Sequence, residues 1–418
     1  MDARTLTRCA INCGNVAGAA EIRNEDAPMT EVHSRRPAFG AVIDQLGLPG
    51  SLRLIPTPAL VCDIDLLTAN LARMADTAAS AAIALRPHVK SHKSAYVARR
   101  QLEGGAVGLA CAKLSEAEVL VERLLADGYE PRISVLLTSP IAGAASAKRA
   151  SLLAERCDLT VVVDHPQGVD ELSAALGISG NPLSVLCDVD VGLGRTGVVG
   201  PHEALAVVER IGQSASLRFA GVQGYGGHLQ HIAGRDERRS AAGESAHRLR
   251  AVIETLESNG HRIPLRTGGG TGTSSLDIEL GVLNELQPGS YVFMDREYRD
   301  ALGDDVEGGF AQSLTIATTV ISANRRDFVT VDAGLKAMAT DAGSPLVVGH
   351  EQESQYHFFG DEHGLVSTGP HVTLGRGDRL ELVPPHCDPT VDRYDFMWLV
   401  RGDVVVGVAD VDARGCSQ

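Results

Sequence analysis

Short apolar runs alternate with longer amphipathic stretches along most of the chain, from about Ile55 onward. This alternation is typical of repeated units in which a buried parallel strand is followed by a covering helix. Eight such units favour a (β/α)8 barrel of the TIM type, although a doubly wound open sheet would alternate in the same way. The runs expected to be strands are Ile83–Leu85, Val107–Ala110, Ile133–Leu137, Leu159–Val163, Ser184–Asp188, Ala220–Gln223, Leu265–Thr267 and Leu283–Leu286.

One of the helical stretches, residues 115–127, also carries a start signal. Ser115 and Glu118 have the spacing of a capping box and precede an apolar stripe. In a capping box, the side chain of the first residue bonds to the backbone of the residue three positions later. The spacing therefore predicts that Ser115 caps this helix.

After about Phe310, the residue pattern changes to runs of β-branched residues separated by Gly and Asp turns. This pattern predicts a separate, mainly antiparallel β-domain with strands at 314–322, 328–331, 372–374 and 379–382. Residues 52–64 are also β-like and are expected to pair with that domain. The predicted organisation is a flexible tail at 1–36, an N-terminal contribution to the β-domain at 37–64, the barrel at 65–305 and the C-terminal β-domain at 306–418.

Charge and composition narrow the class of partner. The chain has 38 basic and 53 acidic residues, a net charge of −15, which disfavours nucleic acid and anionic membranes as partners. No apolar run reaches the roughly 18 residues that span a bilayer. The eight cysteines form no CxxC pair, and no early apolar segment indicates secretion. We therefore expect a cytoplasmic protein that acts on a small molecule.

The unusual polar residues follow predicted strands. Lys90 follows the first strand, Arg195 the fifth, His231 the sixth, and the glycine-rich run 267–273 the seventh. The carboxyl ends of barrel strands meet at one rim, which is the catalytic face of this architecture. We expect these residues to lie together at that rim.

Lys90 and the glycine run suggest a cofactor. Arg86 and Lys93 add positive charge near Lys90, which would favour a neutral, nucleophilic amine in a partly desolvated site. Consecutive glycines let backbone N–H groups converge on a phosphate. A lysine amine and a phosphate site on one rim indicate pyridoxal phosphate. A surface lysine and an ordinary glycine turn are the alternative interpretations.

Four runs in order, at 86–93, 190–198, 268–273 and 384–390, resemble the D-threonine aldolase group. This group and its relatives, the D-serine dehydratases, are pyridoxal phosphate enzymes similar to alanine racemase. The resemblance extends from about Pro56 to Gly407. It implies a barrel plus a β-domain, a homodimer and a divalent metal beside the cofactor.

The resemblance also implies roles for individual residues. Lys90 matches the Schiff-base lysine, and His231 matches the catalytic histidine. The other matches concern cofactor binding, with Arg195 and Tyr225 at the ring and Gly269, Gly270 and Thr271 at the phosphate.

The run His386-Cys387-Asp388 matches the metal-binding position of the group. The dehydratases carry His-x-Cys there, which suits zinc, whereas His-x-Asp suits manganese or magnesium. In an extended segment, His386 and Asp388 would face the same way and share one ion, with Cys387 pointing elsewhere. A solvent-exposed turn is the structural alternative. Asp332, Lys336 and Asp341 are left without a role.

The expected reaction is the cleavage of a D-3-hydroxy amino acid, similar to D-threonine or D-3-hydroxyaspartate, into glycine and an aldehyde. His231 would take the proton of the substrate hydroxyl, which the metal coordinates. Two alternatives remain open. One is a D-serine-type dehydratase that forms a keto acid and ammonia, and the other is a non-catalytic pyridoxal phosphate carrier.

Overall fold

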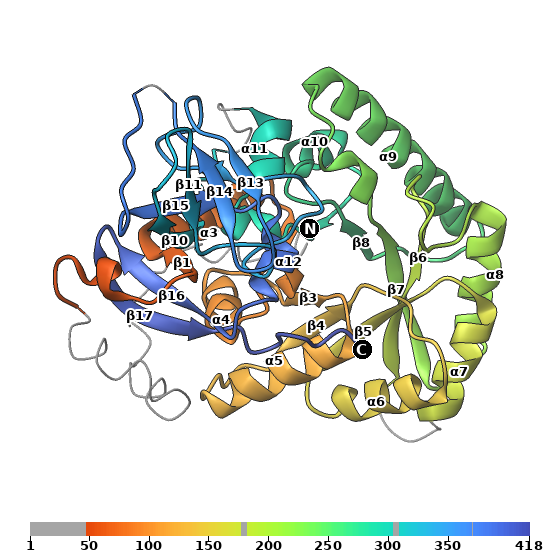
Figure 1. The fold of residues 1–418 in the computed structure, drawn as a ribbon. Coiled ribbons are helices and arrows are strands. Elements are labelled where there is room, and N and C mark those ends of the chain that lie inside the picture. Colours follow the sequence, from red (N-terminus) through yellow and green to blue (C-terminus); the bar gives the residue numbers. More distant parts are fainter. Residues whose placement is uncertain (1–46, 177–181, 304–308, 370) are drawn as a thin grey trace, which may run out of the picture.

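The computed structural model describes residues 47–176, 182–303, 309–369 and 371–418. Two sheets organise this part of the chain, one of eight strands and one of nine. Figure 1 shows the first sheet surrounded by helices and the second sheet beside it. The predicted tail at 1–36 lies outside the described residues.

The eight-stranded sheet is parallel and confirms the predicted barrel. Its order is β2-β9-β8-β7-β6-β5-β4-β3, and each strand overlaps one of the eight predicted runs. Backbone bonds from Val107 to Leu85 (2.8 Å) and from Ala110 to Pro87 (2.9 Å) join its two ends. The strands are β2 (Ala84–Leu85), β3 (Leu109–Cys111), β4 (Ser134–Leu137), β5 (Asp158–Val163), β6 (Leu183–Asp188), β7 (Leu217–Gly224), β8 (Leu265–Gly268) and β9 (Glu285–Leu286).

Helices cover the outside of the barrel (Figure 1). Short 3-10 turns follow some strands at the rim, and α11 lies between the barrel and the second sheet. The helices are α3 (Ile64–Ser80), α4 (Ala95–Glu103), α5 (Leu114–Ala126), α6 (Ala144–Ala154), α7 (Pro166–Leu176), α8 (Pro201–Gly212), α9 (Arg235–Ser258), α10 (Ser274–Leu280) and α11 (Arg296–Leu302). The 3-10 turns are η4 (Val89–Ser91), η5 (Gly227–Leu229) and η6 (Ser290–Val292).

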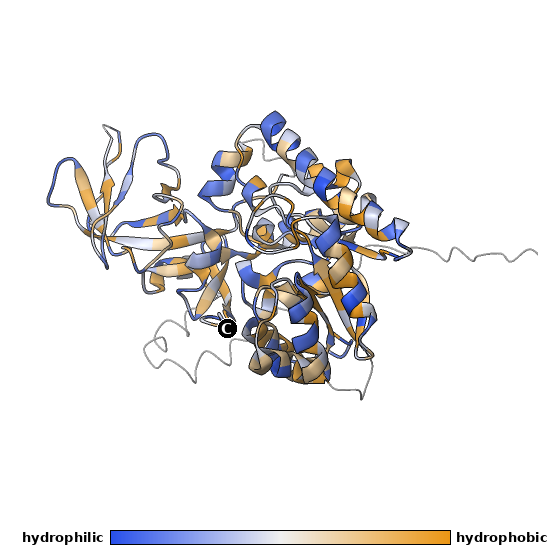
Figure 2. Cartoon of the chain, turned by 90° about the vertical axis from the view of Figure 1, so that its right-hand side faces the viewer, coloured by the Kyte–Doolittle hydropathy of each residue, from blue (hydrophilic) through white to orange (hydrophobic). Residues whose placement is uncertain are grey.

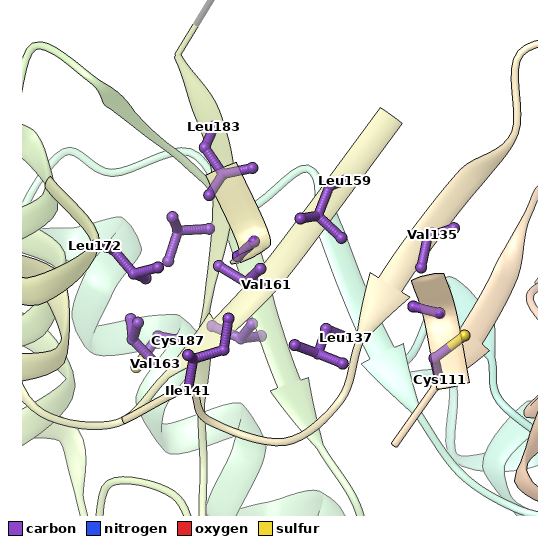
Figure 3. Close-up of a cluster of buried hydrophobic side chains, with 14 of the residues drawn as sticks. Cys111, Val135, Leu137, Ile141, Leu159, Val161, Val163, Leu172, Leu183 and Cys187 are labelled. Carbon is purple, nitrogen blue, oxygen red and sulfur yellow. The ribbon is translucent and has the colours of Figure 1, made fainter. Parts of the chain in front are cut away.

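The two faces of the barrel strands pack into different clusters. Val161 and Val163 of β5 pack in the large outer core with Leu172 of α7, as Figure 3 shows. The intervening Val162 belongs to a small separate cluster with Leu136 and Leu186 of the neighbouring strands. Side chains alternate across a strand, so one set meets the helices and the other fills the barrel. Figure 2 shows the result as mostly hydrophobic strands enclosed by helices of mixed character.

The predicted capping box at Ser115 is wrong. Helix α5 begins at Leu114 after Lys113, without a side-chain cap. The Ser115 hydroxyl instead donates to the backbone oxygen of Gln418 (2.8 Å), and Glu118 pairs with Arg149. Ser115 and Glu118 therefore both contact residues distant in sequence, and the local spacing does not reveal such contacts.

The nine-stranded sheet is mainly antiparallel. Its main path is β13-β14-β11-β10-β1-β16-β17, and β15 pairs with both β10 and β12. Strand β1 pairs with β10 and, in parallel, with β16, as expected for part of segment 52–64. The strands are β1 (Ala59–Asp63), β10 (Leu314–Ser322), β11 (Phe328–Val331), β12 (Leu346–Val347), β13 (Tyr356–Phe358), β14 (Gly364–Ser367), β15 (Arg379–Val383), β16 (Phe396–Arg401) and β17 (Val404–Asp410).

Two details of the β-domain differ from the prediction. Residues 51–54 form the 3-10 helix η3 (Ser51–Leu54) rather than a strand. Residues 372–374 have no strand structure. The exact domain boundaries stay a prediction.

Asp295 joins the two parts of the molecule at the barrel rim. One of its oxygens accepts the N–H of Tyr298 in α11 (3.0 Å), and the other accepts the N–H of Cys387 (2.8 Å). Cys387 begins helix α12 (Cys387–Val391), which follows β15. Asp295 is fully buried, and burial raises its pKa to about 6. One carboxylate therefore caps two helices from different parts of the chain.

We expect Asp295→Ala to lower the free energy of unfolding by about 3 kcal/mol, because two buried N–H groups lose their acceptor. Asp63 is the matched control. Its carboxylate also accepts two N–H groups, those of Asp65 and Leu66, but near the surface, where water can replace it. Asp63→Ala should cost about 1 kcal/mol. Urea unfolding measures both, and equal costs would contradict the linking role of Asp295.

Candidate active site

Lys90 lies at the rim of the barrel and reaches the other part of the molecule. It sits in η4 just beyond β2, where the His88 ring accepts its backbone N–H (3.3 Å). Its ammonium donates to a carboxylate oxygen of Asp388 in α12. The Lys90 side chain is 38% exposed and that of Asp388 12%. This ion pair joins residues 298 positions apart.

The neighbouring basic residues do not act on Lys90 as predicted. Arg86 pairs with Glu285 at 2.9 Å, and Lys93 pairs with Asp392 at 2.8 Å. Desolvation would lower the pKa of Lys90, but the charge and hydrogen bond of Asp388, with Tyr225, hold that pKa above its ordinary value. In this state Lys90 is a paired ammonium, because each basic side chain has its own carboxylate.

His386 and Asp388 lie at the start of a helix, so the predicted extended geometry is wrong. His386 is the N-cap of α12, and Asp388 belongs to its first turn. A proline is tolerated in the first turn of a helix, which is where Pro389 falls. The proximity of His386 and Asp388 therefore follows from the helix start rather than from strand alternation.

The surroundings of this pair orient both side chains. His386 Nδ1 lies 2.7 Å from a carboxylate oxygen of Asp341, and Ser290 donates to Asp388 at 3.2 Å. Burial raises the pKa of Asp388, but Lys90 and then His386 hold it well below its ordinary value. Across the described ranges, no group of three or more His, Cys, Asp or Glu side chains is arranged to hold a metal. His386 and Asp388 are thus two possible metal donors, and Asp341 contacts Nδ1 of the histidine.

His231 lies in the loop after β7, as predicted. Its Nδ1 is 3.3 Å from Glu297, and its ring centre is 4.8 Å from that of Tyr298, edge to face. Partial burial and then the charge of His386 lower the pKa of His231 to about 4. The imidazole is therefore neutral at pH 7. Electrostatic coupling to Lys90 and Asp388 places it in the same cluster.

Arg195 and Tyr225 also meet at the rim. The Arg195 guanidinium lies over the Tyr225 ring, 5.5 Å from its centre. The loop that carries Arg195 is held by Asp190, which accepts the N–H groups of Gly192 (2.8 Å) and Gly194 (2.9 Å). Tyr225 directly follows β7 and contributes to the pKa shift of Lys90.

The glycine run is tightly packed. Gly269 has φ +73°, and a Cβ there would lie 2.5 Å from Asp277. A Cβ on Gly270 would lie 2.5 Å from Gln230, whose side chain also accepts the N–H of Gly272 (2.9 Å). The loop therefore requires glycines for its own conformation, whether or not it holds a phosphate. The Thr271 hydroxyl accepts the N–H of Tyr291 at 3.0 Å.

Sequence reasoning missed several residues of this cluster. Glu297 and Tyr298 contact His231, and Asp341 contacts His386. The first two lie in a helix of seven residues without a recognisable motif, and Asp341 stands in a run rich in Asp, Ala and Gly that is typical of turns. Lys336, also unassigned, pairs with Glu362 at the surface. No sequence spacing distinguishes Glu297 and Asp341 from ordinary surface carboxylates.

Comparison with known proteins agrees with this geometry. Residues 62–297 match the family described as alanine racemase, N-terminal domain, and residues 313–400 match the putative serine dehydratase domain. The described residues include no helix long and apolar enough to cross a membrane.

Individual relatives cover most of the chain. A D-threonine aldolase from Arthrobacter is 36% identical over 88% of this chain and 96% of its own length. A 3-hydroxy-D-aspartate aldolase from Paracoccus denitrificans is 35% identical over 86% of this chain and 92% of its own length. The crystal structure of D-threonine aldolase from Filomicrobium marinum has a TM-score of 0.83 and 36% identity, and the match covers 89% of this chain and 99% of that one. The chain therefore belongs to the D-threonine aldolase group of the alanine-racemase-like pyridoxal phosphate enzymes.

Proposed function

We propose that this enzyme cleaves D-3-hydroxy amino acids similar to D-threonine into glycine and an aldehyde, using pyridoxal phosphate and a divalent metal. The observation that carries the proposal is the convergence of Lys90, His231, His386 and Asp388 at one rim of the barrel. These groups provide an amine, a neutral base and a pair of metal donors. A metal-assisted retro-aldol cleavage would use all three.

The residues at the rim fit the cofactor. Lys90 would hold it covalently, and Arg195 and Tyr225, which contact each other, would flank its ring. Gly269, Gly270 and Thr271 would hold its phosphate through the tight loop described above. When bound, pyridoxal phosphate supplies an electron sink for the electron pair released at the substrate Cα.

The donor set fits a hard divalent ion. His386 provides a ring nitrogen and Asp388 a carboxylate, while Asp341 orients the histidine through its other nitrogen. The imidazole of His386 and the carboxylate of Asp388 are the nitrogen and oxygen donors that suit such an ion, and the buried Cys387 thiol donates to Asp388 at 3.3 Å. Manganese or magnesium therefore fits better than zinc.

His231 is suited to accept the proton of the substrate hydroxyl. Its pKa of about 4 leaves the ring unprotonated at pH 7, so a nitrogen lone pair is available to the hydroxyl proton. A dehydratase would instead need a base at the Cα proton and would release the hydroxyl group.

Product analysis tests the proposal. With pyridoxal phosphate, Mn²⁺ and D-threonine, we expect glycine and acetaldehyde in equal amounts, because the Cα–Cβ bond breaks. D-serine should give little keto acid or ammonia. Ammonia and a keto acid without glycine would establish the dehydratase instead, and no turnover of either substrate would favour a carrier.

Absorbance spectroscopy tests the role of Lys90. We expect Lys90→Ala to lose the visible absorbance band of a lysine-bound cofactor and to lose at least 10³-fold in kcat, roughly the scale for a residue in covalent catalysis. Lys148→Ala, on the outer helix α6, is the control and should keep both. A band that persists in Lys90→Ala would remove Lys90 from this role.

Metal binding tests the role of Asp388. Because the Lys90 ammonium pairs with Asp388, we expect cofactor-free Lys90→Ala to bind Mn²⁺ about tenfold more tightly than the cofactor-free wild type. His386→Ala should weaken binding by at least the same factor. Electron paramagnetic resonance of free Mn²⁺ measures each dissociation constant. Equal constants in all three proteins would contradict the proposed metal pair.

The homodimer and the cytoplasmic location stay predictions. Sedimentation velocity at several protein concentrations would establish the oligomeric state.

A further inference from the structure

Two consecutive residues of α11 hold the His231 ring. Glu297 lies 3.3 Å from its Nδ1, and Tyr298 packs against the ring with an interplanar angle of 62°. His231 itself belongs to a loop after the 3-10 turn η5 rather than to a helix or strand. Its orientation therefore depends on α11.

The position of Glu297 favours one tautomer of the His231 ring. A carboxylate can accept a hydrogen bond from a ring N–H but repels a ring lone pair, so Glu297 at 3.3 Å favours the tautomer with the proton on Nδ1. The lone pair then lies on Nε2. A base held in this way presents the same nitrogen to the substrate in every cycle, as a histidine does when a carboxylate fixes its tautomer.

The position of Glu297 is itself tied to the proposed metal pair. Its backbone N–H donates to Pro385 (3.2 Å), and that of Arg296 donates to Pro384 (3.0 Å). These prolines directly precede His386, and the buried Asp295 caps both α11 and α12. Glu297 therefore belongs to the same rigid unit as His386 and Asp388.

We propose that Glu297 is a positioning residue, which fixes the tautomer and the orientation of His231 relative to the metal pair. This inference rests on the proposed role of His231 as the base. Glu297 acts through the histidine and does not itself exchange a proton with the substrate.

A double-mutant cycle tests the proposal in the cofactor- and Mn²⁺-loaded enzyme. Glu297→Ala should lower kcat about tenfold or more with less than about a twofold change in KM, because a misplaced base loses part of a contribution of about 10²–10⁴. Glu297→Gln keeps an acceptor oxygen without the charge and should give an intermediate kcat. In the His231→Ala background, Glu297→Ala should have no further effect. The same loss of kcat in both backgrounds would overturn the proposal.

A second measurement does not depend on turnover. In metal-free protein with ¹⁵N-labelled histidine, long-range ¹H–¹⁵N spectra should show His231 protonated at Nδ1, with its signals assigned by their loss in His231→Asn. Glu297→Gln should shift this tautomer equilibrium. Protonation at Nε2 in the wild type would overturn the proposal. If Glu297→Ala does not fold, the glutamine variant carries both tests.

Glu279→Ala is the matched control, since Glu279 of α10 makes an ion pair with Arg239 of α9 at the surface. It should leave kcat and the His231 spectrum unchanged, and an effect as large as that of Glu297→Ala would contradict a specific role. Absence of glycine formation by the wild type would refute the proposed function. The tautomer measurement would still decide whether Glu297 positions His231.

Discussion

The candidate site depends on the double hydrogen bond of Asp295. A buried carboxylate is costly unless its oxygens find donors, and here two helix starts provide them. One helix carries the residues that hold His231, and the other carries His386 and Asp388. Without this carboxylate, the two helices would be joined mainly by the backbone bonds from residues 296 and 297 to residues 384 and 385. Asp295 and these backbone bonds thus fix the relative placement of the base and the metal donors, although the hydrogen bonds of Asp295 are to backbone N–H groups of Tyr298 and Cys387.

Charge pairing across the rim has a related effect. Three basic residues, Arg86, Lys90 and Lys93, lie within eight positions of the chain, and each meets a different carboxylate. Of these carboxylates, Asp388 lies in α12 and Asp392 is the C-cap of that helix. The barrel and the β-domain are therefore held together by ion pairs at the same place where the chemistry is proposed. Because Lys90 is one of these residues, covalent use of its amine would release Asp388.

Much of the fold could be predicted from the sequence. The eight apolar runs of the barrel are visible because buried parallel strands are nearly continuously hydrophobic, and β10 and β11 have the predicted bounds. The rim positions of Lys90 and His231 followed from strand order alone. The capping box at Ser115 and the extended segment at His386 were wrong, because contacts with Gln418 and the start of α12 decided those structures.

The residues that were missed differ in kind from those that were found. Lys90 and His386 stand in recognisable motifs because the proposed chemistry demands a particular residue type, and the glycine run does so because its backbone leaves no room for side chains. Glu297, Asp295 and Asp341 only have to present a carboxylate to a neighbouring group, and any segment that reaches the neighbour can do so. Their identity is therefore fixed by tertiary geometry rather than by spacing. Sequence motifs identify the residues proposed to contact the ligand. The residues that set the protonation and orientation of those residues are identified only in the folded structure.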